Sequence, residues 1–206
     1  MGRPRAGTNR TSTPERLLQA AEVAFSAVGF GTAKLADIAQ RAGIRRPSLL
    51  YHFASKEDLY AATVERCIAR LRRALSEVFE ADGDFTTRLM QTTERYVEFV
   101  QGEPELSRLV LRELLDGNGP GQKILLRQIV PLVDDVERFI RTQGKDVVRP
   151  DVPVRAAVLM MASDVFLRSA TGPLKQPLWG EEDHAKSLAR ILLLHETPDQ
   201  EDRQEQ

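Results

Sequence analysis

Apolar side chains recur along most of the chain at intervals of three and four residues, and almost no segment alternates with period two. This spacing places apolar residues on one face of an α-helix, whereas a half-buried strand would need strict alternation. The first stripe comprises Leu17, Ala21, Ala24, Phe25 and Val28. It follows Thr13-Pro14-Glu15, where a capping residue and a proline favour a helix start. Gly29 is expected to end this helix.

Cap residues, prolines and glycines divide the rest of the chain into further helices. Two short helices are expected at about 34–41 and 46–53, with Gly43 between them. A long helix should begin after Ser55 and end before the Asp82-Gly83-Asp84 break. Five more helical segments are expected at 85–101, 104–116, 122–143, 153–170 and 181–195. Pro131 should kink or divide the segment 122–143. The pattern therefore predicts an all-α fold with a three-helix head, a connecting helix and a helical body.

The apolar runs 156–162 and 191–194 are far shorter than the roughly 20 residues that a membrane-spanning helix needs. The first residues also lack the apolar run of a signal peptide. A single cysteine, Cys67, cannot form an internal disulfide, which favours a reducing compartment. We therefore expect a cytoplasmic, nucleoid-associated protein without membrane partners. The polar segments 1–12 and 197–206 are expected to be disordered.

Charge is divided unevenly along the chain. Residues 1–56 hold nine Lys or Arg against three acidic residues, whereas the remainder holds 20 basic and 27 acidic residues. A basic N-terminal quarter suits a polyanion-binding head, because neutralisation of phosphates drives such binding. Chance clustering on a solvated face would give the same count, so charge alone leaves both readings open.

The stretch 35–53 has the pattern of a helix-turn-helix. Ala39 is small enough for two helices to cross there, and Gly43 allows the tight turn. Five apolar residues can point inward towards the first helix: Ile38, Ala42, Ile44, Leu49 and Phe53. The outward residues are hydrogen-bond donors or rings that stack: Arg45, Arg46, Ser48, Tyr51 and His52. This composition is typical of a helix that enters the DNA major groove.

The same region closely resembles the signature of the TetR family of bacterial helix-turn-helix transcription regulators. The matching positions are Gly31-Thr32, Ile38-Ala39, Ala42-Gly43-Ile44, Pro47-Ser48-Leu49, His52-Phe53 and Ser55-Lys56-Glu57-Asp58-Leu59. The resemblance covers about residues 11–71. It implies a DNA-binding domain at 13–71, with its helix-turn-helix at about 34–53, joined to a regulatory and dimerisation domain at 72–196. The DNA-binding residues that it implies are Lys34, Arg45, Arg46, Pro47, Ser48, Leu50, Tyr51, His52 and Lys56.

One position departs from the family pattern. The family usually has a DNA-contacting tyrosine where this chain has Leu50, which cannot donate a hydrogen bond but can touch a thymine methyl; Tyr51 is the neighbour that can compensate. Arg45 or Arg46 can grip a guanine edge or hold phosphate, and we favour at least one base contact. The tail segment Gly2-Arg3-Pro4 resembles an AT-hook element, although a solvated basic tail that adds only electrostatic affinity is the alternative.

In this family the last two helices pair with those of a second subunit, and the middle helices enclose a ligand. Candidate dimer residues are Val154, Val158, Met161, Val165, Leu188, Ile191, Leu192 and His195. Candidate pocket residues are Tyr96, Phe99, Arg108, Arg112, Phe139, Met160, Asp164, Phe166 and Trp179. Ordinary intrachain core is the alternative for both sets. Asp164 stands out as a carboxylate in an apolar run, suited to a ligand amine or to Arg168.

An enzyme is not expected. His52, His184 and His195 lie in different segments without metal-ligand spacing, and Cys67 falls on an apolar stripe. No phosphate-binding loop or nucleophile elbow is present, so we expect no catalytic residues, metal or cofactor. The sequence predicts a ligand-responsive repressor that binds a palindromic operator as a homodimer. The alternatives are a ligand-independent architectural DNA-binding protein and a helical dimer that acts through protein partners.

Overall fold

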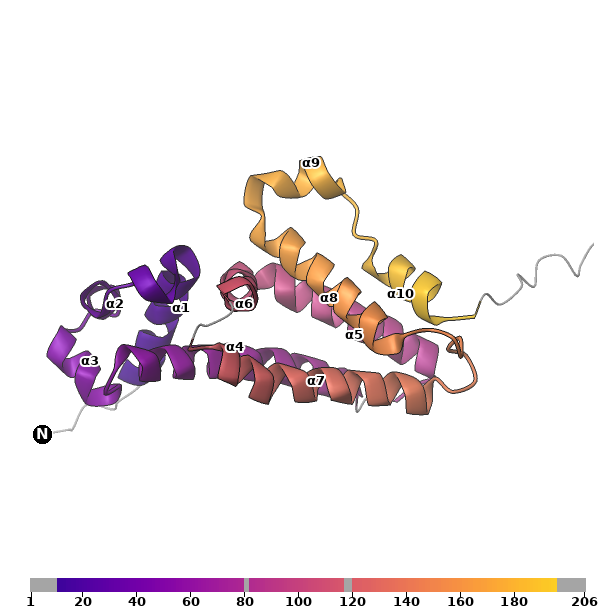
Figure 1. The fold of residues 1–206 in the computed structure, drawn as a ribbon, viewed down its shortest axis with the longest axis horizontal. Helices are drawn as coiled ribbons and strands as arrows, with labels where there is room; N and C mark the ends of the chain where they lie inside the picture. Colours follow the sequence, from indigo (N-terminus) through magenta and orange to yellow (C-terminus); the bar gives the residue numbers. More distant parts are fainter. Residues whose placement is uncertain (1–10, 80–81, 117–119, 196–206) are drawn as a thin grey trace, which may run out of the picture.

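The computed structural model describes residues 11–79, 82–116 and 120–195, and within these ranges the fold is all-α (Figure 1). The expected disorder of residues 1–10 and 197–206 lies outside the described residues. The helices are α1 (Thr13–Thr32), α2 (Leu35–Arg41), α3 (Arg46–His52), α4 (Lys56–Phe79), α5 (Phe85–Gly102), α6 (Pro104–Asp116), α7 (Gln122–Gln143), α8 (Val154–Ala170), α9 (Lys175–Trp179) and α10 (Ala185–Leu193). The all-α prediction is confirmed.

Several helix ends differ from the sequence expectation. The N-cap of α1 is Ser12, whose hydroxyl oxygen accepts a hydrogen bond from the Glu15 N–H at 3.4 Å, so the cap lies one residue before Thr13. Gly29 leaves helical geometry with φ +77°, yet a further turn follows it to Thr32. Pro131 lies inside α7 without dividing it. Packing of α7 along α4 and α8 accounts for this, because tertiary contacts offset the one lost hydrogen bond.

The C-terminal part contains elements that periodicity did not indicate. The expected helix at 181–195 is shorter, and a 3-10 turn at Gly172–Leu174 leads into the five-residue α9. In Figure 1 this α9 segment projects from the body between α8 and α10. So short an element has too few residues to show a helical repeat, which explains why the sequence pattern did not reveal it.

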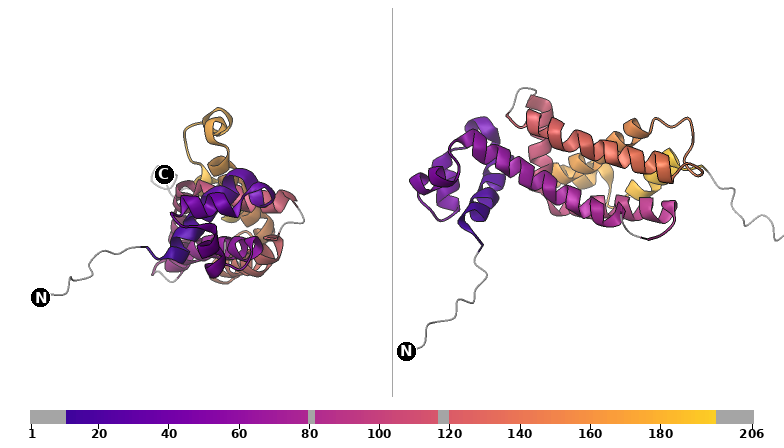
Figure 2. Two further views of the ribbon diagram at one scale, coloured as in Figure 1. Left: turned by 90° about the vertical axis from the view of Figure 1, so that its left-hand side faces the viewer. Right: turned by 90° about the horizontal axis from the view of Figure 1, so that it is seen from below.

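Helices α1 to α3 form a head at one end of an elongated molecule, and α4 leads from the head into the body (Figure 2). In the body, α4 packs against α5 and α7, while α8 packs against α5, α6, α7 and α10. Helix α6 contacts both α1 in the head and α8 in the body. The head therefore meets the body through two helices, α4 and α6.

A single apolar core continues from the head into the body. It includes Phe25 and Ile38 in the head, Tyr60 in α4, and Leu109 and Val165 in the body. A second cluster at the far end of the body joins α5, α7, α8 and α10. The domain boundary predicted between residues 71 and 72 falls inside α4. Because the core is continuous, a displacement in the body can reach the head through packed side chains.

Ion pairs also fasten α1 to α4. Glu22 is 5% exposed and accepts from Arg66 at 2.7 Å and from Arg70 at 2.6 Å. Arg66 also binds Glu15, and Arg70 binds Glu103 at the start of α6. This network gives the head a defined orientation on α4. None of the described helices is both long and apolar enough to cross a membrane.

Candidate DNA-binding surface and ligand cavity

The turn between α2 and α3 has the geometry that the helix-turn-helix pattern requires. Gly43 adopts φ +70°, a conformation that an L-side chain rarely tolerates. Ala39 is fully buried where α2 and α3 pack together, and the side chains of Ile38 and Leu49 are fully buried as well. The inward set therefore orients α3 with its opposite face towards solvent.

That opposite face gathers the polar residues expected to meet DNA. Arg45 is the N-cap residue of α3, and Arg46, Pro47 and Ser48 form its exposed first turn. Tyr51 is 86% exposed, whereas the neighbouring Leu50 is 38% exposed. An N-terminal turn carrying two guanidinium groups is suited to an anionic groove, because their positive charges attract the phosphates.

Two further residues of the predicted DNA-binding set flank α3. Lys34 is the exposed N-cap of α2. The Lys56 ammonium donates to the Gly31 carbonyl oxygen at 3.0 Å and lies 4.7 Å from the centre of the Phe30 ring. Lys56 thus ties the start of α4 to the end of α1 and supplies positive charge beside α3. The DNA contacts of all these residues stay predictions.

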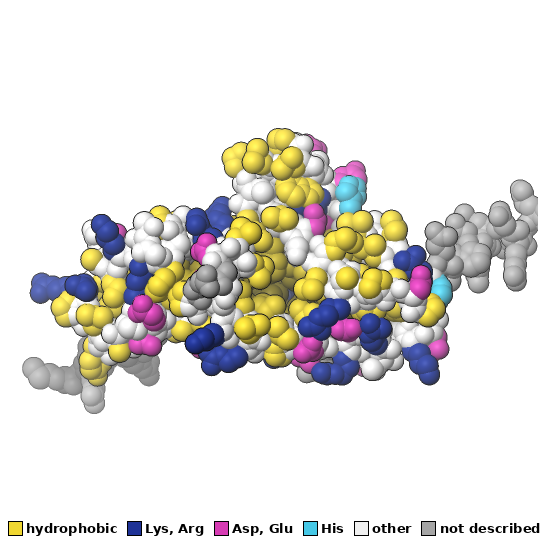
Figure 3. Space-filling model, in the orientation of Figure 1, with side chains coloured by type: hydrophobic (Ala, Val, Ile, Leu, Met, Phe, Trp, Pro, Cys, Tyr) yellow, Lys and Arg dark blue, Asp and Glu magenta, His cyan; other side chains and the backbone are white. Residues whose placement is uncertain are grey.

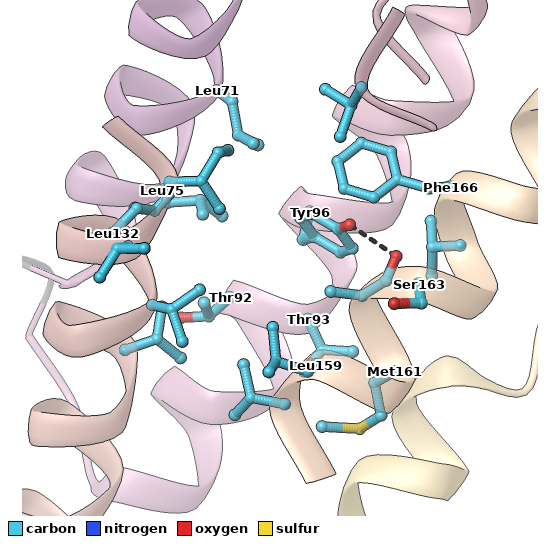
Figure 4. A pocket seen from close by; sticks show the side chains of 18 of the residues that line it. Leu71, Leu75, Thr92, Thr93, Tyr96, Leu132, Leu159, Met161, Ser163 and Phe166 are labelled. Atoms are coloured by element: carbon cyan, nitrogen blue, oxygen red, sulfur yellow. Dashed lines mark hydrogen bonds between the residues drawn. The ribbon is translucent and has the colours of Figure 1, made fainter. Parts of the chain in front are cut away.

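The body encloses a largely apolar cavity of about 410 Å³ between α4, α5, α6, α7 and α8. Figure 3 shows its apolar hollow on the face between α7 and α8. In the close view, Leu71 and Leu75 of α4 form one wall, and Tyr96 and Phe166 form the opposite wall (Figure 4). The volume lies within the range of small-molecule sites, which are usually lined by apolar side chains with few polar groups.

Polar side chains in the wall mostly bond to nearby backbone. The Thr92 hydroxyl donates to the Arg88 carbonyl at 2.7 Å, and the Thr93 hydroxyl donates to the Leu89 carbonyl at 2.9 Å. The Tyr96 hydroxyl donates to the Ala162 carbonyl at 2.9 Å, and burial raises the pKa of Tyr96. These three hydroxyls keep their protons on protein acceptors, so the polar wall residues with a donor left for a ligand are Gln122 and Ser163.

Two of the nine predicted pocket residues, Tyr96 and Phe166, line this cavity. The other seven lie elsewhere. Phe99 packs against the core, and Arg108 lies on the surface beside Glu105. Phe139 belongs to the second core cluster, and Met160 is 56% exposed.

Three of those seven make specific polar contacts instead. Arg112 donates to the carbonyls of Ser26 and Ala27 in α1 at 3.2 and 3.0 Å. Asp164 accepts from the Trp179 indole N–H at 2.7 Å and lies 3.7 Å from the Arg168 guanidinium. The cavity is formed mainly by aliphatic residues on α7 and α8 that carry no sequence signal distinguishing them from core.

The cavity is also lined by one charged residue that the sequence analysis did not single out. Glu113 of α6 is 3% exposed, and its Oε1 accepts a hydrogen bond from the Tyr60 hydroxyl of α4. Burial and the neighbouring Glu113 carboxylate raise the pKa of Tyr60. The Tyr60 ring packs edge-on against Phe25 and Phe30 of the head, at 4.8 and 5.1 Å between ring centres. A lone acidic residue among the apolar positions of 106–114 was the available signal.

The predicted dimer residues divide into two groups. Val154 and Val165 are buried in the chain's own core, and Val158, Met161 and Val165 line the cavity. Leu192 packs against the second core cluster, whereas Leu188, Ile191 and His195 are exposed. Exposed apolar residues follow one face of α8 at Leu159, Met160 and Leu167. Helical rotation explains the difference, because a shift of one residue turns a side chain by about 100°.

Cys67, the single cysteine of the chain, lies in α4 and packs in the core. Cys67 is fully buried, and burial together with the Glu22 carboxylate raises the pKa of its thiol. A buried thiol of raised pKa is a packing residue rather than a nucleophile. In the described ranges, no cluster of three His, Cys, Asp or Glu side chains could hold a metal ion.

Comparison with known proteins links this geometry to a family. The family described as "Bacterial regulatory proteins, tetR family" matches residues 17–63, which span the head and the start of α4. The HTH-type transcriptional activator FasR of Mycolicibacterium smegmatis is 32% identical over 114 residues, covering 52% of this chain and 52% of FasR. The chain thus spans about half the length of the curated relatives it first matches.

Solved structures extend the likeness in fold to nearly the whole chain. A TetR-like transcriptional regulator from Rhodococcus is 22% identical with a TM-score of 0.67, covering 93% of this chain and 98% of that one. The regulator FadR from Bacillus subtilis, solved in complex with stearoyl-CoA, is 14% identical with a TM-score of 0.70, covering 86% and 96%. At these identities the likeness shows a shared fold.

Proposed function

We propose that the chain is a transcription regulator of the TetR family, which its residues 17–63 resemble, and that it binds operator DNA as a homodimer. The observation that carries the proposal is the exposed face of α3, which presents Arg45, Arg46, Ser48 and Tyr51. The opposite face of the helix is held in the core by the buried Leu49. Rigid presentation matters, because base edges are read only by side chains held in register with the groove.

The two arginines divide between specificity and affinity. A guanidinium that binds O6 and N7 of one guanine supplies about 1–3 kcal/mol of base discrimination. A guanidinium on phosphate supplies affinity that falls with salt and reads no sequence. Arg45 and Arg46 are consecutive, so their side chains leave α3 in different directions. We propose that one reads a base and that the other anchors phosphate, with Leu50 against a thymine methyl.

Dimerisation follows from what a palindromic site requires. Two recognition helices must lie about one DNA turn apart, which a two-fold dimer provides. The exposed apolar stripe on α8, together with Leu188 and Ile191 of α10, supports this pairing. We place the interface there, and not on Val154 or Val165, because buried side chains cannot meet a second subunit.

Charge placed on this stripe is expected to separate the subunits. Leu188 and Ile191 are 38% and 67% exposed, so Leu188→Glu with Ile191→Glu should fold normally yet desolvate two carboxylates at the interface. Light scattering coupled to size-exclusion chromatography should give a dimer for the wild type and a monomer for the double variant. Leu115→Glu, at an 84% exposed position of α6, is the matched control. A dimer that survives both changes would place the interface elsewhere.

The cavity supports regulation by a small molecule. Its aliphatic wall suits a mostly apolar effector, and FadR, which shares the fold, was solved with stearoyl-CoA. Part of the wall comes from α4 and α6, the two helices that also contact the head. We propose that the effector changes the head's position through them, so that effector and DNA affect each other's affinity reciprocally. Repression by occlusion of the promoter is the expected outcome.

Selection of bound DNA from a random duplex pool, at moderate salt and followed by sequencing, tests the DNA-binding proposal. An enriched inverted repeat is expected, with half-sites about one helical turn apart. Binding without enrichment, lost as salt rises, would favour the architectural alternative. Absence of DNA binding would favour a helical dimer that acts through protein partners.

A further inference from the structure

Glu113 is the one charged side chain among the described residues that line the cavity, and none of those residues is Lys, Arg or His. Its carboxylate is deeply buried, and it takes part in no ion pair between described residues. An isolated carboxylate in apolar surroundings is costly, because burial removes water that solvated the charge. A buried ionisable group in a cavity is a candidate for a functional site. Glu113 is therefore a candidate for binding a ligand and for transmitting the effect of that ligand.

The two oxygens of Glu113 have different surroundings. Oε1 accepts the hydrogen bond of the Tyr60 hydroxyl, whereas Oε2 is buried and has no hydrogen-bond partner in the protein. The carboxyl group also packs closely on Gly121 at the start of α7, where a Cβ atom would lie 2.6 Å from Oε2. The Glu113 carboxylate thus contacts α4, α6 and the start of α7, and its Oε2 remains free to accept a hydrogen bond.

The remaining wall narrows the chemistry of a ligand. The hydroxyls of Thr92, Thr93 and Tyr96 already donate to backbone carbonyls, and most other wall residues are aliphatic. A bound carboxylate would face Glu113 with no cation in the wall to neutralise either charge. A donor group would instead complete the hydrogen bonding of Glu113 and relieve its burial cost.

We propose that the cavity binds an apolar molecule carrying one hydrogen-bond donor, preferably an ammonium group, and that this group binds the carboxylate of Glu113. The inference rests on the regulatory function proposed above and specifies the class of effector. The apolar part of the molecule fills the space between α4, α5, α7 and α8. Its donor end lies at α6, one of the two helices that contact the head.

This placement also connects the ligand to the DNA-binding head. A donor bound to Oε2 shares the carboxylate whose Oε1 accepts from the Tyr60 hydroxyl, and the Tyr60 ring packs on Phe25 and Phe30. The neighbouring Arg112 holds two carbonyls of α1 just before Gly29. A displacement of Glu113 can therefore reach α1 through one intermediate side chain, that of Tyr60. Tyr60 and Arg112 act as positioning residues that carry the ligand's effect to the head.

Three ligands with the same apolar part and different head groups test the proposal: 4-phenylbutylamine, 4-phenylbutanol and 4-phenylbutanoate. Their affinities for the full-length dimer are measured by isothermal titration calorimetry without DNA. The amine should bind about tenfold more tightly than the alcohol, since hydrogen bonds to charged groups are the stronger class. The carboxylate should bind most weakly. A carboxylate that binds as tightly as the amine, or no binding by any of the three, overturns the proposal.

Variants assign the preference to Glu113. Glu113→Gln should reduce amine affinity about tenfold and change alcohol affinity little, while Glu105→Gln, at a surface position of the same helix, should change neither. Val130→Trp, at a partly exposed wall position of α7, should weaken all three ligands by occupying the cavity. An unchanged amine preference in a folded Glu113→Gln variant overturns the proposal. Because no DNA is present, this outcome is independent of whether an operator is found.

Discussion

Replacement of both Arg45 and Arg46 by alanine is expected to lower operator affinity by a factor of about ten to several hundred at fixed salt. One bidentate base contact is worth about 1–3 kcal/mol, and about 1.4 kcal/mol corresponds to tenfold in affinity. Both side chains are exposed at the start of α3 and form no ion pair among the described residues that their loss would break. The variant should therefore fold as the wild type does. Fluorescence anisotropy with the selected operator measures the effect.

The single variants separate the two roles. Loss of the base-reading arginine should relax selectivity at one operator position, whereas loss of the phosphate-binding arginine should reduce the salt dependence by about one unit of slope. Arg141→Ala, far from the head in α7, serves as the control. If the double variant binds the operator as tightly as the wild type, α3 does not read DNA through its arginines.

Phe25→Ala is expected to lower the free energy of unfolding by about 3–5 kcal/mol, a large share of a typical total of about 5–15 kcal/mol. The Phe25 side chain is fully buried, and its ring lies 4.8 Å from that of Tyr60 and 6.2 Å from that of Phe30. Its removal leaves a cavity where α1, α4 and α6 meet. Urea unfolding followed by circular dichroism, at one protein concentration, measures the change.

Val28→Ala is the control for this change, because Val28 lies in the same helix and is 47% exposed. Its effect should stay within about 0.5 kcal/mol. Since Phe25 also touches the residue that binds Glu113, the destabilised variant should lose part of the coupling between cavity and operator. A loss of stability below about 1 kcal/mol would show that the head is not packed on α4 through this side chain.

Much of the fold could be predicted because its signals are local. The bounds of α6 and α7 match the expected segments, since Pro104 and the glycines near 117–121 interrupt helical periodicity at those points. Ala39 and Gly43 are required by the crossing and the turn whatever the rest of the protein does. The exposed set on α3 follows directly from burial of the other face.

The cavity could not be predicted in the same way. Leu132 and Val158 have the same chemistry and spacing as core residues, and only the distance between α7 and its neighbours leaves space beside them. Asp164 stood out in the sequence, yet Trp179 and Arg168 occupy its oxygens. Glu113 has no cation beside it in the cavity wall: its carboxyl group contacts Gly121 and accepts from the Tyr60 hydroxyl at Oε1 alone.

The sequence by itself determined the all-helical fold, the helix-turn-helix head, the resemblance to the TetR family and the residues presented by α3, because periodicity, caps and turn glycines act within a few positions of the chain. The tertiary structure decided which apolar residues form the core, the cavity wall or an exposed face, and it gave Glu113 its buried, half-satisfied carboxylate. Those properties depend on how closely helices that are distant in sequence approach one another, and the type of an apolar residue does not indicate that separation.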